Sequence, residues 1–220
     1  EIPVSEKALF SLNWKLAGEK KDGSKLLSFW RKKAMDEGLI QLQGRIALFP
    51  AKSDKGKIVL FDPKKPEREI ARLETEILIG REKKDRFTVA DFIRPISENV
   101  RDYVGLQIAT SGIFSMEAVE NLKNAGDTEG ALMLQGLANR YVEDFAEYLH
   151  KKMRNLAGLG EKDGARYSPG YPGIPLKENE KLYTLLKAEE LGIILTEAHG
   201  FLPLATTAAL VVFHKNAGYA

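Results

Sequence analysis

The clearest periodic pattern in the chain is an apolar stripe with helical spacing between residues 132 and 156. Apolar residues recur there every three or four positions over about six turns, which is the spacing of one helix face. The stripe consists of Leu134, Leu137, Ala138, Tyr141, Phe145, Leu149 and Met153. Two glycines, Gly158 and Gly160, follow directly, and we expect them to end the helix.

Two shorter segments also carry apolar residues at helical spacing. Residues 26–40 predict a helix that ends near Gly38, and residues 178–191 predict a helix that ends at Gly192. We expect both helices to present one apolar face to the core.

Strand patterns dominate the first half of the chain. Residues 43–51 predict a strand that stops near Pro50, and residues 55–62 predict a second strand. The SDKG sequence between these two segments is typical of a turn, so we expect a hairpin. Residues 68–75 alternate between apolar and polar and predict a third strand.

Further along, the short segment 88–93 is compatible with a helix or a strand, and residues 102–112 predict a buried strand that leads into a loop of small residues. A kink at Pro203 and a last strand over residues 208–213 complete the pattern. Because strands and helices are interspersed without regular alternation, the pattern favours an α+β fold with a largely antiparallel sheet over a doubly wound one.

Composition narrows the classes of function. With 44% hydrophobic and 29% charged residues, the chain has the make-up of a globular protein, and its 220 residues fit one large domain or two small ones. The net charge of only +2 gives no electrostatic reason to expect nucleic acid or an anionic membrane as a partner.

The absence of cysteine excludes disulfides, zinc–thiolate sites and cysteine nucleophiles, and it fits a reducing compartment. The first residues are mixed and charged, unlike a signal peptide, and the longest apolar run is far shorter than the ~20 residues that span a bilayer. We therefore expect a cytoplasmic protein without a membrane partner.

Common catalytic signatures are missing. The chain has no glycine-rich dinucleotide fingerprint after a strand, no phosphate-binding P-loop and no nucleophile elbow. Its histidines, His150, His199 and His214, lack the spacing of metal ligands, and we expect a structural role for His150 near a helix C-terminus. We expect neither a metal site nor a self-contained catalytic site.

One segment concentrates candidate chemistry, the ARYSPGYP sequence at residues 165–172. Pro169 and Pro172 each fix a backbone torsion, and Gly170 permits a turn or a close approach to a ligand. A stiff loop of this kind binds at a lower entropic cost than a mobile one.

The side chains of this loop suggest what it holds. Arg166 offers a planar fork that suits a carboxylate or phosphate, and Tyr167 and Tyr171 offer aromatic faces for a ring or a cation. On spacing alone two other interpretations stay open, since prolines at every third position also suit a packed connector or a peptide that docks into another protein.

The loop and six other stretches resemble the activation domain of cobalamin-dependent methionine synthase, the module that binds S-adenosylmethionine in that family. The family hallmark R-x-x-x-G-Y-P occurs here from Arg166 to Pro172, and the resemblance extends over nearly the whole chain. The other stretches are NWKLAG (13–18), ALFPA (47–51), ADFI (90–93), DYVGLQIATSG (102–112), DFAEYLHKKMR (144–154) and LTEAHGFLP (195–203).

This resemblance implies a single α+β domain over residues 1–220, with a twisted, mostly antiparallel sheet flanked by helices and not a Rossmann-like fold. The domain would serve reductive methylation. In the family, S-adenosyl-L-methionine and an electron from a flavoprotein, here a flavodoxin-like donor, return inactive cob(II)alamin to methylcobalamin for methionine biosynthesis. Cobalamin itself would be held by a partner subunit in trans, because the homocysteine, folate and cobalamin domains do not fit in 220 residues. The domain would then be a component of a methyltransferase.

The resemblance also implies roles for individual residues. Arg166 would bind the methionyl carboxylate, Tyr171 would lie near the sulfonium, and Glu143 would face the positive end of the ligand. The remaining contacts would come from the backbone of Tyr167, Ser168, Pro169 and Gly170 around the adenine and from Tyr219 near the C-terminus. An early acidic residue of the family pattern has Asp22 as its candidate.

Glu143 is less obvious from the helical pattern, since it lies about 140° from the apolar stripe. It can serve a site only if that face of the helix borders the cleft. The C-terminal stretch 198–213 departs from the family pattern and suggests an alternative, a scaffold that keeps the fold but no longer binds S-adenosylmethionine. A methyltransferase with another acceptor is a third hypothesis.

Overall fold

The computed structural model describes residues 23–79, 86–160 and 163–217. A six-stranded sheet with the order β3-β2-β1-β6-β10-β7 forms its centre, and every neighbouring pair in it is antiparallel. The strands are β1 (Gln43–Asp54), β2 (Lys57–Phe61), β3 (Glu69–Glu74), β6 (Asp102–Thr110), β7 (Ala165–Tyr167) and β10 (Thr206–Val212). The predicted α+β class with a mostly antiparallel sheet is confirmed.

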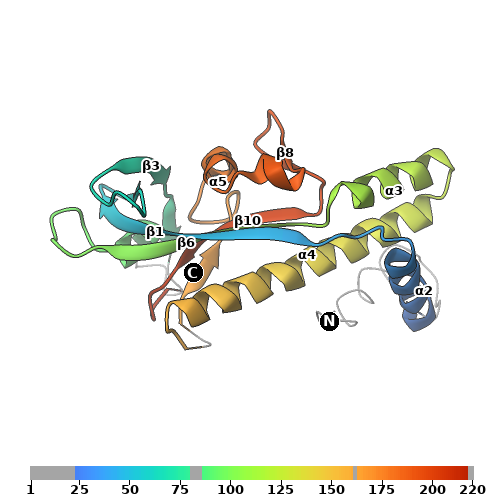
Figure 1. The fold of residues 1–220 in the computed structure, drawn as a ribbon, viewed down its shortest axis with the longest axis horizontal. Coiled ribbons are helices and arrows are strands. Elements are labelled where there is room, and N and C mark those ends of the chain that lie inside the picture. Colours follow the sequence, from blue (N-terminus) through green and yellow to red (C-terminus); the bar gives the residue numbers. More distant parts are fainter. Residues whose placement is uncertain (1–22, 80–85, 161–162, 218–220) are drawn as a thin grey trace.

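Helices lie on both sides of this sheet. Figure 1 shows α4 running along one side, with α5 and β8 on the other. The helices are α2 (Gly23–Asp36), α3 (Ile113–Asn124), α4 (Thr128–Leu156) and α5 (Asn179–Leu185), with short 3₁₀ turns η1 (Val89–Phe92), η2 (Leu176–Glu178) and η3 (Ala188–Leu191). Two small hairpins complete the fold, β4 (Ile77–Ile79) with β5 (Arg86–Thr88) and β8 (Ile194–Leu195) with β9 (Phe201–Leu202).

The main helix matches its predicted stripe but begins earlier than expected. The carboxylate of Asp127 accepts a hydrogen bond from the Gly130 amide at 2.8 Å and thereby caps the first turn of α4. Before this cap, residues 113–124 form α3, an element that the sequence pattern did not predict. The first half of α4 encloses a separate apolar cluster together with α2 and α3, built around Trp30 and Leu134.

Two predicted boundaries were wrong for reasons of tertiary structure. Strand β1 continues through Pro50 to Asp54, because β2 pairs with β1 only from Ala51 onward and Pro50 therefore faces a single neighbour, β6. The predicted helix over 178–191 breaks after Leu185, and Lys187 has a left-handed φ of +49° that no helix continues through. The guanidinium of Arg45 binds the carbonyls of Leu186 and Lys187 at this break, at 2.8 and 3.0 Å. The segment 88–93 forms the 3₁₀ turn η1.

Alternating residues of the sheet form two apolar layers. One face of β6 and β10 buries Leu106, Ile108 and Leu210 in the main core, while the other face meets α4 through Ala109. The helix comes very close to this second face. A Cβ added at Gly44 would lie 2.8 Å from Leu149 Cδ1.

The same close approach generates a test at Gly105. A Cβ there would lie 2.7 Å from Sδ of the fully buried Met153, so Gly105→Ala should push α4 away from the sheet and lower the free energy of unfolding by about 1–3 kcal/mol. Urea denaturation measures the loss. The double variant Gly105→Ala/Met153→Ala should lose less free energy of unfolding than the sum of the losses of the two single variants, because the shortened side chain makes room for the new Cβ. Strict additivity of the two losses would contradict the proposed packing.

Candidate functional site

Strand β7 presents the predicted cation at the edge of the sheet. Because side chains alternate along a strand, Arg166 faces α4, while the neighbouring Tyr167 points to the opposite face and is fully buried in the main core. The expectation that the Tyr167 ring offers a face to a ligand was therefore wrong. Only the backbone of Tyr167 is left for such a role.

The turn that follows β7 is fixed by its own backbone. The amide of Tyr171 donates to Ser168 O at 3.1 Å, and the amide of Gly170 donates to Ile174 O at 3.0 Å. Gly170 has a φ of +87°, which places it in the left-handed region that a glycine tolerates without strain. The stiffness predicted for this segment thus comes from hydrogen bonds as well as from the prolines.

A second glycine fastens the loop to the rest of the fold. Gly173 has a φ of +104°, and a Cβ there would lie 2.9 Å from Cγ2 of Val89. Its carbonyl accepts a hydrogen bond from the Glu76 amide at 2.9 Å. The loop packs against its own domain, which disfavours the interpretation as a peptide that docks into another protein.

A cleft of about 490 Å³ opens between this loop, the first half of β10, the β8–β9 hairpin and α4. Its size lies within the range of small-molecule sites. Five of the predicted site residues line it, and Gly170 and Tyr167 do not. The lining consists of Glu143, Arg166, Ser168, Pro169, Tyr171, Leu176, Asn179, Gly200, Phe201, Thr206, Thr207 and Ala208.

Glu143 borders this cleft despite its position away from the apolar stripe. Its Oε2 lies 3.4 Å from Nη2 of Arg166, which forms an ion pair between α4 and β7. The Arg166 side chain is 20% exposed and that of Glu143 is 55% exposed. The structure thus brings a cation and an anion together at one wall of the cleft.

Behind this pair, the same side of α4 carries a buried histidine. His150 Nδ1 lies 3.6 Å from Glu147 Oε2, and the Arg154 guanidinium contacts the imidazole at 3.3 Å. Burial lowers the pKa of His150, and the positive charges of Arg154 and Arg166 lower it further, while Glu147 partly opposes them. The imidazole is therefore neutral at pH 7, unlike the cation expected at a helix C-terminus.

Sequence patterns missed the opposite wall of the cleft. Asn179, at the start of α5, is buried and donates from Nδ2 to the carbonyl of His199 at 2.8 Å. This bond holds the turn 196–200. Gly200 at the end of the turn and Phe201 directly after it line the cleft. The stretch LTEAHGFLP (195–203) belongs to the family resemblance, but no sequence pattern assigned Asn179, Gly200 or Phe201 to the site, because they come together only when α5 and the β8–β9 hairpin pack side by side.

Other predicted residues lie beyond what the structure describes. Tyr219 and Asp22 fall outside the described residues, as does the NWKLAG stretch. Within the described ranges, no group of three or more His, Asp or Glu side chains could hold a metal ion. No helix in those ranges is long and apolar enough to cross a membrane.

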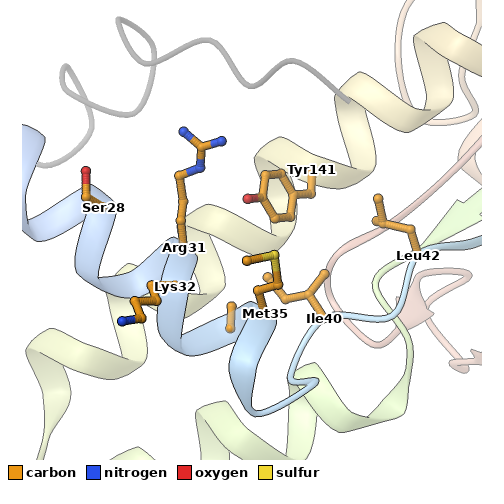
Figure 2. A pocket seen from close by; sticks show the side chains of 8 residues that line it. Ser28, Arg31, Lys32, Met35, Ile40, Leu42 and Tyr141 are labelled. Atoms are coloured by element: carbon orange, nitrogen blue, oxygen red, sulfur yellow. The ribbon is translucent and has the colours of Figure 1, made fainter. Parts of the chain in front are cut away.

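A second hollow of about 430 Å³ lies between α2 and α4 and shares no lining residue with the cleft beside Arg166 (Figure 2). It is surrounded by Arg31 and Met35 of α2, by Ile40 in the segment after α2, and by Tyr141 of α4. None of the predicted site residues lies there, so the site is assigned to the cleft beside Arg166.

His150 generates a prediction on stability. Because its pKa in the folded state lies below the unfolded value of about 6.5, only the unfolded chain takes up a proton as the pH falls below that value. The free energy of unfolding should therefore fall between pH 7 and 5, and His150→Gln should flatten this slope. Urea denaturation at several pH values measures it, and equal slopes for both proteins would contradict a depressed pKa.

Comparisons with known proteins agree with this architecture. The chain is 25% identical over 254 aligned positions to the methionine synthase of Mycobacterium tuberculosis (strain ATCC 25618 / H37Rv), covering 98% of this chain but 21% of that protein. The chain thus spans about a fifth of the length of this curated relative.

A solved structure shares the fold. The crystal structure of a MetH reactivation domain bound to AdoHcy matches with a TM-score of 0.82 at 22% identity, over 98% of this chain and 78% of that one. The family model described as vitamin B12 dependent methionine synthase, activation domain, matches residues 20–220. The chain therefore belongs to the family of vitamin B12-dependent methionine synthase activation domains.

Proposed function

We propose that this chain, as a single domain, binds S-adenosyl-L-methionine in the cleft between α4 and the loop after β7. The observation that carries the proposal is the pairing of Arg166 with Glu143 at one wall of that cleft. An amino acid's zwitterionic end needs both charges, a guanidinium fork for its carboxylate and a carboxylate for its ammonium group. The structurally related reactivation domain was crystallised with AdoHcy, the demethylated form of this ligand.

The rest of the cleft suits the other parts of the ligand. The Tyr171 side chain is two-thirds exposed and offers an aromatic face to the sulfonium. Leu176 and Phe201 supply apolar surface for the adenine ring, and the backbone from Tyr167 to Gly170 supplies polar groups beside it. Tyr219, close to the C-terminus, completes the set of proposed contacts.

The bound methyl donor would serve a cobalamin held by a partner subunit or domain of methionine synthase in the cytoplasm. That cobalamin would supply the nucleophile that accepts the methyl group, with an electron from a flavodoxin-like donor, and S-adenosylhomocysteine would remain in the cleft. The residues of this chain would bind and orient the donor, with Arg166 at its carboxylate, Glu143 at its ammonium group and Tyr171 at its sulfonium. The domain would then need no catalytic base of its own.

Calorimetric titration tests the binding step. S-adenosylmethionine and S-adenosylhomocysteine should each bind the wild type at one site. Arg166→Ala should weaken binding by about 1.5–3 kcal/mol, the typical contribution of a hydrogen bond to a charged group. Arg140→Ala is the matched control. It also removes an arginine from an ion pair, the one between Arg140 and Asp144 of α4, but neither residue lines the cleft.

Unchanged affinity in Arg166→Ala would place the ligand elsewhere. No binding by the folded wild type, alone or with the cobalamin-binding subunit, would favour the scaffold alternative. Consumption of S-adenosylmethionine without any corrinoid would instead favour a methyltransferase with another acceptor.

Asn179 gives a second test at the opposite wall. Asn179→Ala removes the hydrogen bond to His199 O and should loosen the turn that carries Gly200 and Phe201. We expect the affinity for S-adenosylhomocysteine to fall about fivefold, in line with the loss of one hydrogen bond worth ~1 kcal/mol. Asn121→Ala on the exposed face of α3 is the control, and equal affinities of the two variants would contradict the positioning role of Asn179.

A further inference from the structure

We propose that Glu143 and Arg166 form an internal charge pair that an incoming ligand must exchange, so that the cleft selects ligands carrying both an ammonium and a carboxylate group. This inference rests on the proposed function and concerns how the site discriminates. It goes beyond two separate contacts, because it makes the recognition of one end of the amino-acid group depend on the other.

The burial of the two partners differs, and this difference sets the direction of the exchange. Arg166 is four-fifths buried, so its charge needs a counter-charge close by. Glu143 is more than half exposed, and water can hydrate its carboxylate when it leaves the pair. The pair therefore opens by movement of Glu143 and not of Arg166.

The geometry of the contact favours such opening. The Nη2–Oε2 distance of 3.4 Å is longer than the ~2.7–2.9 Å typical of a tight charge-assisted hydrogen bond. A ligand carboxylate that approaches the guanidinium as a fork can form shorter bonds than Glu143 does. The exchange thus replaces a long internal contact by better external ones.

No other charged group in the cleft lining can substitute for either partner. Among the described residues that line the cleft, Glu143 is the one carboxylate and Arg166 is the one cation. The next two carboxylates along α4 lie outside the lining and have other partners, since Asp144 lies 2.6 Å from Arg140 and Glu147 lies 3.1 Å from Arg154. Glu143 and Arg166 are therefore the two charged side chains that a ligand meets along the described lining of the cleft.

Ligands that carry only one of the two charges are disfavoured as a result. A carboxylate without an ammonium group must displace Glu143 and then lie beside a like charge. An ammonium group without a carboxylate must attract Glu143 away from Arg166 and then lie beside the guanidinium. Only a zwitterionic end leaves both protein charges compensated after the exchange.

Half-ligands make the test sharp. We would titrate S-adenosylhomocysteine, its desamino analogue and its decarboxylated analogue into the wild type, Glu143→Gln and Arg166→Gln. Glu143→Gln should raise the affinity for the desamino analogue about fivefold, since it removes a competing and repelling charge worth ~1 kcal/mol at a partly exposed site. Arg166→Gln should likewise raise the affinity for the decarboxylated analogue.

Glu147→Gln is the matched control, because it removes a carboxylate one turn further along the same helix and outside the cleft lining. It should leave the affinities for all three ligands unchanged. Since Glu143 is largely exposed, its substitution should preserve the fold, which circular dichroism and thermal unfolding of the ligand-free protein verify.

The outcomes separate this inference from the proposed function. If the folded wild type does not bind S-adenosylhomocysteine, the proposed function fails. If the wild type binds it and Arg166→Gln weakens that binding, but Glu143→Gln leaves or lowers the affinity for the desamino analogue, then Glu143 is a simple contact. In that case the exchange is refuted while the proposed function stands.

Discussion

The close packing of α4 on the sheet is the constraint on which the rest of the structure depends. Gly44 and Gly105 leave no room for a Cβ beneath this helix, so the backbone of the sheet and the side chains of α4 approach more closely than larger residues would allow. This contact sets the height of α4 above the edge strand β7. The distance between Glu143 and Arg166 follows from it.

A single helix thereby serves two purposes with two faces. Its apolar stripe fills the space above β6 and β10, and its polar side, with Glu143, Glu147, His150 and Arg154, runs past the edge of the sheet. At that edge the sheet ends in the three-residue strand β7, which leaves space for a cleft where a longer strand would pack against the helix. The site thus arises where the sheet ends and the helix continues.

The backbone that lines the cleft is held by hydrogen bonds, while one of its charged side chains is free to change its position. Backbone hydrogen bonds and Gly173 hold the loop after β7, and Asn179 holds the turn on the other side. The side chain of Glu143, in contrast, is about half exposed and can move without disturbing the core. Such an arrangement suits a site that keeps its shape and exchanges one charge when a ligand enters.

The sequence by itself determined the elements with strong local signals and the chemistry of one loop. The helical stripe, the first hairpin, the strand over residues 102–110 and the α+β class followed from periodicity, because local spacing dictates which face of an element is apolar. The stiffness of the segment around Gly170 followed from its prolines and glycine, and the motif from Arg166 to Pro172 identified the family that the family model confirms.

Tertiary structure alone decided the features that depend on neighbours. Strand β1 passes through Pro50 because of where β2 begins. The chain leaves the helical conformation after α5 at Lys187, where Arg45, far away in the chain, binds the carbonyls of Leu186 and Lys187. The orientation of Tyr167 into the core and the contribution of Asn179 to the cleft also depend on pairing and docking. Glu143 is the clearest case, since its position on the helix left open whether it is solvated or borders a site, and only the docking of α4 beside β7 places it in the cleft lining.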